Sequence, residues 1–234
     1  MPPSEPVRWY FSLRSPYSWL TYRDLMAHYP DVAGALRWIP FWEPDERSER
    51  MLHAAGGRFP YVAMSRPKHL YMLQDVRRLA RARGLSITWP ADRSPCWEVA
   101  HLAYLVAEAE GMHREFVAAV YRERWERGRD ICLPATIAAI GRELGLDPDR
   151  LAGAADDERV RDRGTEILLA IDRDGVFGVP FFIRGYDRFW GLDRLSNVVA
   201  LVRGTAGTER PAPDVDYPEP SPLTADLGHA GGCG

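Results

Sequence analysis

The sequence is poor in cysteine and almost without lysine. Its three cysteines, Cys96, Cys132 and Cys233, are odd in number and far apart, and no Cys-x-x-Cys is present. These spacings exclude a zinc ribbon and a dithiol redox motif, and they do not suggest a disulfide framework. Lys68 is the single lysine among 30 basic residues, which stand against 33 acidic ones. The resulting net charge of -3 gives no basic footprint, so no nucleic-acid partner is expected.

Long apolar runs are also absent, since none approaches the ~20 residues that span a bilayer. The first six residues carry neither a basic stretch nor an apolar one, so they do not form a signal peptide. The histidines show no His-x-x-x-His spacing, and the pair His229 and Cys233 is too sparse to hold a metal. We therefore expect a cytoplasmic protein with no membrane partner and no metal.

The chain has 234 residues, 46% of them hydrophobic and 27% charged, the balance of a soluble globular protein. Residues 7–13 are rich in aromatic and β-branched types and predict a strand. A turn and a helix to about residue 28 follow, and then a second strand over 36–41. Such a β-α-β unit closes as a right-handed parallel crossover. Strand signals return at 179–184, where a tight turn leads into 188–190 and predicts a hairpin.

Between these strands the apolar residues repeat at helical spacing. The predicted helices cover 66–83, 95–110, 113–126, 134–144 and 157–172, and a last helix follows the hairpin at about 193–203. This order predicts an α/β protein, a thioredoxin-like fold with a large all-helical insertion domain. The predicted parts are 1–44 and 176–203 for the thioredoxin-like domain, 45–175 for the insertion, and 204–234 for a poorly ordered tail rich in proline and glycine.

Three segments carry a resemblance to a known family. They are Tyr10-Phe11-Ser12-Leu13-Arg14-Ser15-Pro16-Tyr17-Ser18-Trp19-Leu20, the helix that begins near Lys68, and Gly175-Val176-Phe177-Gly178-Val179-Pro180-Phe181-Phe182 with the following hairpin and helix. In order, over roughly residues 7–203, they resemble the DsbA-like group. Within that group they are most similar to 2-hydroxychromene-2-carboxylate isomerases and kappa-class glutathione transferases. The chain departs from these enzymes at residues 57–64, which lack an Asn followed closely by a Pro pair.

The resemblance implies roles for particular residues. Disulfide oxidoreductases of this group carry two cysteines where the first strand turns into a helix, but here that motif is Ser15-Pro16-Tyr17-Ser18. Ser15 would hydrogen-bond the sulfur of bound glutathione, or it may be read simply as a helix cap. Pro180 resembles the family's cis-proline, which presents the backbone of Val179 to a peptide-like thiol. The implied cofactor- or substrate-binding residues are Pro16, Tyr17, Trp42, Lys68, Val179, Pro180, Leu192 and Asp193.

Cys96 is a second candidate source of the sulfur. Ser94, Pro95 and Glu98 predict a helix start in which Cys96 is the second helical residue. A thiol at the positive end of a helix has a lowered pKa, so Cys96 could act as a nucleophile together with Ser15. The alternative is that Cys96 is a small buried hydrophobic residue. That alternative is favoured for Cys132, which has no activating neighbour in the sequence.

The function predicted first is cis–trans isomerisation of a conjugated alkene by reversible thiol addition, with the thiol from glutathione or from Cys96. The substrate would be a flat small molecule such as a chromene, an aryl-pyruvate or a polyene acyl chain, free or bound to a carrier. Two other functions stay open at this point. One is a kappa-like glutathione transferase or peroxidase, and the other is a non-catalytic binding protein of thioredoxin fold. The resemblance also implies a homodimer.

Overall fold

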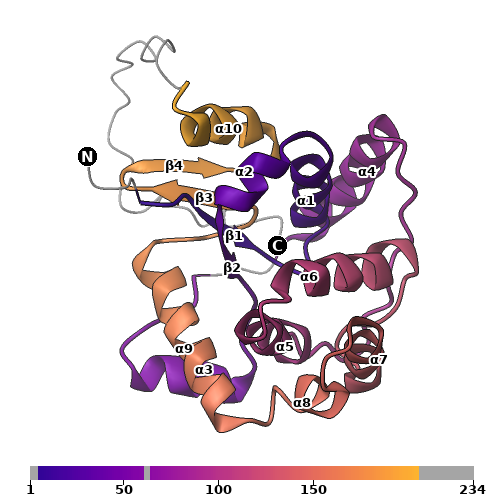
Figure 1. The fold of residues 1–234 in the computed structure, drawn as a ribbon, viewed down its shortest axis with the longest axis vertical. Coiled ribbons are helices and arrows are strands. Elements are labelled where there is room, and N and C mark those ends of the chain that lie inside the picture. The colour runs from indigo at the N-terminus through magenta and orange to yellow at the C-terminus, as the bar shows by residue number, and fades with distance from the viewer. Residues whose placement is uncertain (1–4, 61–63, 206–234) are drawn as a thin grey trace.

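A four-stranded mixed sheet lies in the upper half of the computed structural model, which describes residues 5–60 and 64–205 (Figure 1). The strands are β1 (Arg8–Phe11), β2 (Arg37–Pro40), β3 (Phe181–Arg184) and β4 (Asp187–Trp190), in the order β2-β1-β3-β4. β1 runs parallel to β2 and antiparallel to β3, and β3 runs antiparallel to β4. The predicted parallel β-α-β unit and the predicted hairpin are therefore confirmed.

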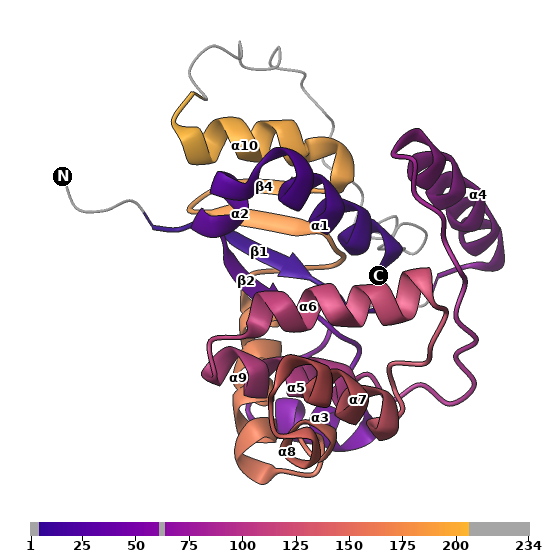
Figure 2. The same cartoon turned by 45° about the vertical axis from the view of Figure 1, so that its right-hand side comes forward.

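Three helices pack together beside this sheet (Figure 2). They are α1 (Pro16–His28), α2 (Pro30–Ala35) and α10 (Leu195–Arg203), the last preceded by a short 3₁₀ helix at Leu192–Arg194. α1 begins with Ser15 as its N-cap and Pro16 as its first residue, a combination that favours a helix start. The sheet and these helices form the thioredoxin-like part of the α/β fold, as predicted.

All other helices lie between β2 and β3 in the sequence. They are α3 (Glu46–Ala54), α4 (Arg66–Ala82), α5 (Glu98–Ala109), α6 (His113–Tyr121), a π-helix (Arg122–Glu126), α7 (Pro134–Leu144), α8 (Pro148–Ala152) and α9 (Glu158–Arg173). Most of them gather where β1 and β2 end, whereas α4 stands apart beside α1 (Figures 1 and 2). The large helical insertion is thus confirmed, although its exact limits at 45 and 175 stay a prediction.

The sheet is joined to the insertion by a cluster of buried aromatic rings. Trp9 lies edge-on to Trp38 with ring centroids 4.7 Å apart, and Phe11 lies edge-on to Tyr104 of α5 at 5.3 Å. Trp9 also stacks on Phe182 of β3 at 6.1 Å. These residues are buried, so the aromatic side chains of the first strand belong to the hydrophobic core, to which they contribute a large apolar area.

Several element boundaries differ from those predicted. α2, α3 and α8 were not predicted, because six, nine and five residues are too few for a clear helical repeat. The last helix begins at Leu195, and Asp193 lies in the 3₁₀ turn that precedes it. Residues 206–234, which hold most of the predicted tail and the pair His229 and Cys233, lie outside the described residues.

Candidate functional site

The turn that leads into α1 is built around Ser15. Its hydroxyl oxygen accepts a hydrogen bond from the backbone N–H of Ser18 at 3.2 Å, and its own N–H donates to the carbonyl of Ser12 at 3.1 Å. The residue has no exposed surface and lines neither of the two cavities described below. The helix-cap interpretation of Ser15 is therefore confirmed, and a contact with a ligand sulfur stays a proposal.

Side chains of the insertion hold this turn in place. The Nε2 atom of His101 on α5 accepts a hydrogen bond from the backbone N–H of Leu13 at 3.1 Å and lies 3.3 Å from the hydroxyl of Ser12. Its Nδ1 atom lies 2.7 Å from the carbonyl oxygen of Trp97, so Nδ1 carries the proton. The hydroxyl of Tyr121 donates to the carbonyl of Ser12 at 3.1 Å. Complete burial lowers the pKa of His101 to about 3, and the ring is neutral.

One cavity, of about 480 Å³, opens between α1, α4 and the loop before β3. The peptide bond between Val179 and Pro180 is cis, as predicted, and both residues line this cavity. Tyr17 also lines it and donates a hydrogen bond from its hydroxyl to Asp75 at 2.9 Å. The predicted binding residues Tyr17, Val179, Pro180, Leu192 and Asp193 thus share one cavity.

The far wall of this cavity depends on Gly191. Its φ of +105° is disfavoured for residues with a side chain, and a Cβ atom there would lie 2.5 Å from Oδ1 of Asp193. The N–H of Gly191 donates to the carbonyl of Pro180 at 3.0 Å, which joins the two walls. The side chains of Asp193 and Arg194 are largely exposed at this wall and form an ion pair with each other at 3.7 Å.

A second, larger cavity of about 760 Å³ borders the same turn, where Arg14 and Pro16 form part of its wall. Two guanidinium groups, those of Arg14 and Arg124, each lie 5.1 Å from the ring centroid of Trp97. Arg14 pairs with Glu43 at 2.8 Å, and Arg124 forms a two-pronged pair with Asp92. Lining residues of α4 are His69, Met72, Leu73 and Arg77.

Two further tryptophans of this wall, Trp89 and Trp125, were not predicted as site residues. Their rings pack edge to face with centroids 5.9 Å apart. The indole N–H groups of both are buried and have no hydrogen-bond partner among the residues that the structure describes. The indole N–H groups of Trp9 and Trp19 in the core are enclosed and unpaired in the same way, so these donors do not indicate a ligand, and the wall offers flat aromatic surface. No sequence signal marks these two residues, because the loop that holds Trp89 and the π-helix that holds Trp125 are far apart in the chain.

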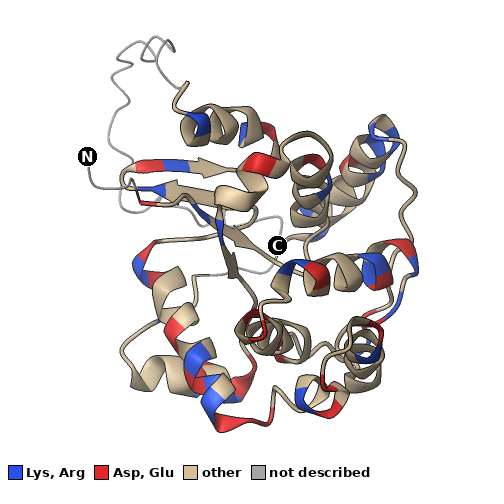
Figure 3. Ribbon diagram, in the orientation of Figure 1, with Lys and Arg blue, Asp and Glu red and all other residues tan. Residues whose placement is uncertain are grey.

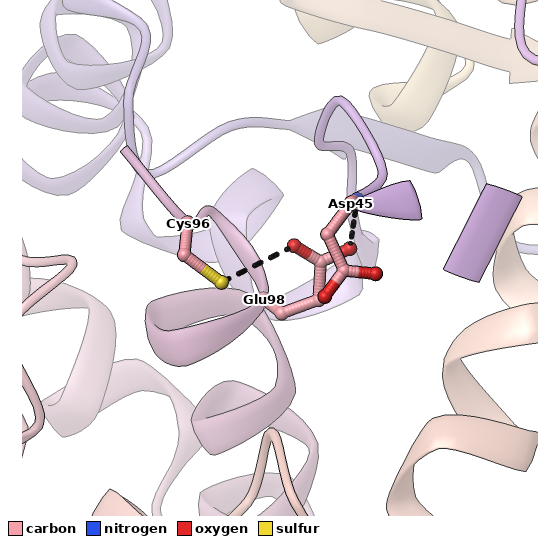
Figure 4. Close-up of side chains that lie close together, drawn as sticks. All are labelled: Asp45, Cys96 and Glu98. Carbon is pink, nitrogen blue, oxygen red and sulfur yellow. Dashed lines mark hydrogen bonds between the residues drawn. The ribbon is translucent and has the colours of Figure 1, made fainter. Parts of the chain in front are cut away.

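Cys96 does not have the environment predicted for it. α5 begins at Glu98 with Trp97 as its N-cap, so Cys96 precedes the helix and Ser94 does not cap it. The thiol is half-buried, lines neither cavity, and points toward the carboxylate of Glu98, whose Oε2 atom is 3.8 Å away (Figure 4). Burial and the negative charges of Glu98 and Asp45 raise the pKa of Cys96, although the N–H groups of Val99 and Glu98 oppose this. The predicted lowering of its pKa was wrong.

Asp45, Cys96 and Glu98 offer three ligand atoms within 4.8 Å of one another, an arrangement that could hold a cation (Figure 4). The oxygens are already engaged, however. Both carboxylate oxygens of Asp45 accept from Arg161, at 3.1 and 2.9 Å. Oε1 of Glu98 accepts from the N–H of Asp45 at 2.7 Å and from Trp42 at 3.2 Å. The cluster therefore links α3, α5 and α9 through hydrogen bonds. These bonds disfavour a metal, because the donors occupy the oxygens that would have to bind it.

Three other residues considered from the sequence lie outside both cavities. Trp42 is buried and stacks on His101 with centroids 5.6 Å apart, so it supports the turn from inside the core. Lys68 lies half-buried in the first turn of α4. Cys132 is buried, and its pKa is raised to about 12, chiefly by desolvation, in line with the inert interpretation.

Among the described residues, no helix is both long and apolar enough to cross a bilayer.

Comparisons with known proteins agree with this arrangement. The family model for the DSBA-like thioredoxin domain matches residues 6–203. A 2-hydroxychromene-2-carboxylate isomerase of Sphingobium xenophagum is 28% identical over 192 residues, which cover 82% of this chain and 95% of that protein. A protein of the same name from Pseudomonas putida is 25% identical and covers 81% and 90%. A solved structure of 2-hydroxychromene-2-carboxylate isomerase superposes with a TM-score of 0.67 at 26% identity, covering 86% of this chain and 97% of that one.

Proposed function

Since the chain belongs to the family of DSBA-like thioredoxin domains but carries no thiol at the start of α1, we propose that it is an isomerase rather than a disulfide oxidoreductase. The proposed reaction is cis–trans isomerisation of an alkene conjugated to a carbonyl group. Relatives named as isomerases, similar along nearly their whole length, support this class. The named substrate of those relatives, a chromene carboxylate, is one member of the flat conjugated class proposed here.

The proposed chemistry is reversible addition of a thiolate. The sulfur forms a C–S bond at the β-carbon, and the π electrons move toward the carbonyl oxygen as an enolate. The former double bond is now single and rotates. The enolate then re-forms the double bond and expels the thiolate, so nothing is consumed and only the geometry has changed. This is covalent catalysis, for which a thiolate close to the substrate is the main requirement.

The observation that carries this proposal is that two cavities share one turn, because neighbouring residues of that turn lie in their walls. Tyr17 lines the smaller cavity, and the preceding Pro16 lines the larger one. A thiol bound in one cavity and an alkene bound in the other would meet at the start of α1. The free N–H groups and dipole at a helix N-terminus favour an anion such as a thiolate or an enolate.

We assign the smaller cavity to a peptide thiol of the glutathione type. Val179 and Pro180 form a backbone wall, which is suited to a peptide, and the exposed ion pair of Asp193 and Arg194 would open to bind the charged ends of a zwitterion. Cys96 is the alternative donor, but its raised pKa and its position outside both cavities favour the bound thiol. Ser15 would act through its hydroxyl and through the cap that it provides.

We assign the larger cavity to the conjugated substrate. Its volume of about 760 Å³ is in the range of small-molecule sites, and its wall of Trp89, Trp97 and Trp125 offers flat apolar surface. Binding energy gained there would orient the alkene toward the start of α1.

The test is an absorbance assay of a cis-configured aryl enone with and without millimolar glutathione. We expect thiol-dependent isomerisation by the wild type and by Cys96→Ser, and a loss of most activity in Ser15→Ala. The cap lost in Ser15→Ala is worth about 1 kcal/mol, so Asp147→Ala, which removes the N-cap of α8, is the matched control and should keep full activity.

Other outcomes identify other functions. Isomerisation that needs no added thiol and disappears in Cys96→Ser would make Cys96 the donor. Formation of a stable glutathione conjugate would favour a transferase. Binding of the enone without any conversion would leave a non-catalytic binding protein and would contradict the proposal.

A further inference from the structure

Helix α4 presents a stripe of exposed residues that is strongly basic, although the whole chain carries a net charge of -3. Most neighbouring members of the stripe are three or four positions apart, and Arg78 directly follows Arg77. Together they cover one side of the helix. Its members are Arg66, Leu70, Gln74, Arg77, Arg78 and Arg81. The helix contains one acidic residue, Asp75, and it stands at the edge of the molecule with blue segments along it (Figures 2 and 3).

Most of this positive charge is not neutralised within the protein. Arg78 pairs with Asp75 at 3.1 Å, but Arg66, Arg77 and Arg81 have no acidic partner in the part of the chain that the structure describes. Two of the three arginines that line the larger cavity are neutralised, and Arg77 is the third. There Arg14 and Arg124 are paired with Glu43 and Asp92.

The stripe runs directly into the larger cavity, because Arg77 belongs to both. A partner seated along α4 would therefore stand over the cavity assigned to the substrate. Of the three unpaired arginines, Arg77 lies at the cavity wall, whereas Arg66 and Arg81 lie outside it near opposite ends of the helix, so the anionic partner should extend beyond the cavity over several helical turns. A small free acid is too short for this, whereas an acidic protein surface is long enough.

We propose that α4 docks an acidic carrier protein that presents the conjugated acyl chain to the larger cavity as a thioester on a flexible arm. This inference rests on the proposed isomerase function. A thioester carbonyl withdraws electrons from the alkene and so favours thiolate addition, whereas the anionic carboxylate of a free acid withdraws them poorly. A lipid surface fits less well, because the large apolar residues exposed on α4 are only Leu70 and Tyr71.

The test compares the same acyl group attached as a thioester to two different thiols, called handles below. A cis-cinnamoyl group is loaded on an acidic acyl carrier protein and, separately, on N-acetylcysteamine. For the full-length protein at low salt, we expect kcat/KM to be roughly tenfold higher with the carrier, and this advantage should shrink at high salt because exposed charges are screened.

The decisive variant is Arg66→Glu with Arg81→Glu, which changes no residue of either cavity. It should lose most of the carrier advantage and leave turnover of the short thioester unchanged. The matched control reverses two exposed arginines at equivalent helix positions in the insertion, Arg142→Glu with Arg159→Glu, and should behave as wild type. Equal kcat/KM for both handles in the wild type, unaffected by the variant, would overturn the proposal.

Binding of the carrier, measured by fluorescence anisotropy, separates this inference from the proposed function. Salt-sensitive binding that the Arg66 and Arg81 variant loses would support docking even if neither handle were isomerised, and only the isomerase would then fail. Absence of carrier binding would overturn docking even if both handles were turned over. Sedimentation with anionic lipid vesicles that depends on the same arginines, without carrier binding, would assign α4 to a membrane surface instead.

Discussion

The ring of His101 accepts a hydrogen bond from the backbone N–H of Leu13 at 3.1 Å, across the boundary between the helical insertion and the thioredoxin-like part. Through its other nitrogen the same ring bonds the carbonyl oxygen of Trp97, 2.7 Å away. Trp97 lines the larger cavity, and Leu13 precedes the turn that begins α1. One buried side chain thus joins two backbone segments that flank the proposed substrate.

We first predict that His101→Phe destabilises the protein and lowers turnover, because it leaves the buried N–H of Leu13 without an acceptor. Such a loss costs about 1–3 kcal/mol. His101→Gln, whose amide oxygen can accept the same bond, should recover part of the stability and of kcat. Urea unfolding and the enone assay measure the two effects. Unchanged unfolding and turnover in His101→Phe would show that this bond positions nothing.

The second prediction concerns acid stability. Because the pKa of His101 is lowered from 6.5 to about 3 by burial, the unfolded chain binds a proton there that the folded protein does not. Stability should therefore fall as the pH drops from about 6.5 toward 3. His101→Gln removes this contribution and should give a flatter stability curve. The control is His53→Gln, which changes an exposed histidine of α3 and should keep the wild-type slope.

The sequence was informative where local patterns decide structure. The strands, the hairpin, the Ser15 cap and the cis-proline at Pro180 were all predicted, because turn chemistry, strand alternation and a motif resemblance are readable from adjacent residues. The helices over 66–82 and 134–144 were predicted almost to the residue, since each has a long apolar repeat and a proline in its first turn.

The larger cavity and the state of Cys96 were not predictable in the same way. Trp89 and Trp125 meet in space although they are separated by 36 positions of chain, and no local pattern reports such a contact. Ser94 and Pro95 predicted a helix start, but the helix begins only at Glu98. The buried carboxylate of Glu98 accepts hydrogen bonds from the N–H of Asp45 and from the indole of Trp42, two residues far away in the sequence. In this orientation the other carboxylate oxygen of Glu98 lies 3.8 Å from the sulfur of Cys96.

The third prediction follows from this charge. Glu98→Gln removes a carboxylate that raises the pKa of Cys96, so a larger fraction of the thiol should be ionised at neutral and mildly alkaline pH. Alkylation of Cys96 by iodoacetamide should become faster, with its pH profile shifted to lower pH. The measurement uses a background with Cys132→Ser and Cys233→Ser, which leaves one thiol.

The control for this experiment is Glu108→Gln, which neutralises a carboxylate farther along the same helix and should not change the rate. If Glu98→Gln alkylates no faster than its parent, the carboxylate does not suppress the thiolate, and the case against Cys96 as the sulfur donor weakens.

The last prediction concerns Gly191. In Gly191→Ala the new methyl group would meet Asp193 at 2.5 Å in a backbone conformation that residues with a side chain rarely adopt, so the loop must move. Strain of this kind costs about 1–3 kcal/mol. The control is Gly185→Ala in the hairpin turn, where φ is +59° but no atom lies within 4 Å of the added methyl. Both variants should unfold at lower urea than wild type. We expect millimolar glutathione to raise the melting temperature of the wild type and of Gly185→Ala, but not that of Gly191→Ala. A normal glutathione shift in Gly191→Ala would mean that the thiol is not held between Pro180 and Asp193, and the smaller cavity would then need another ligand.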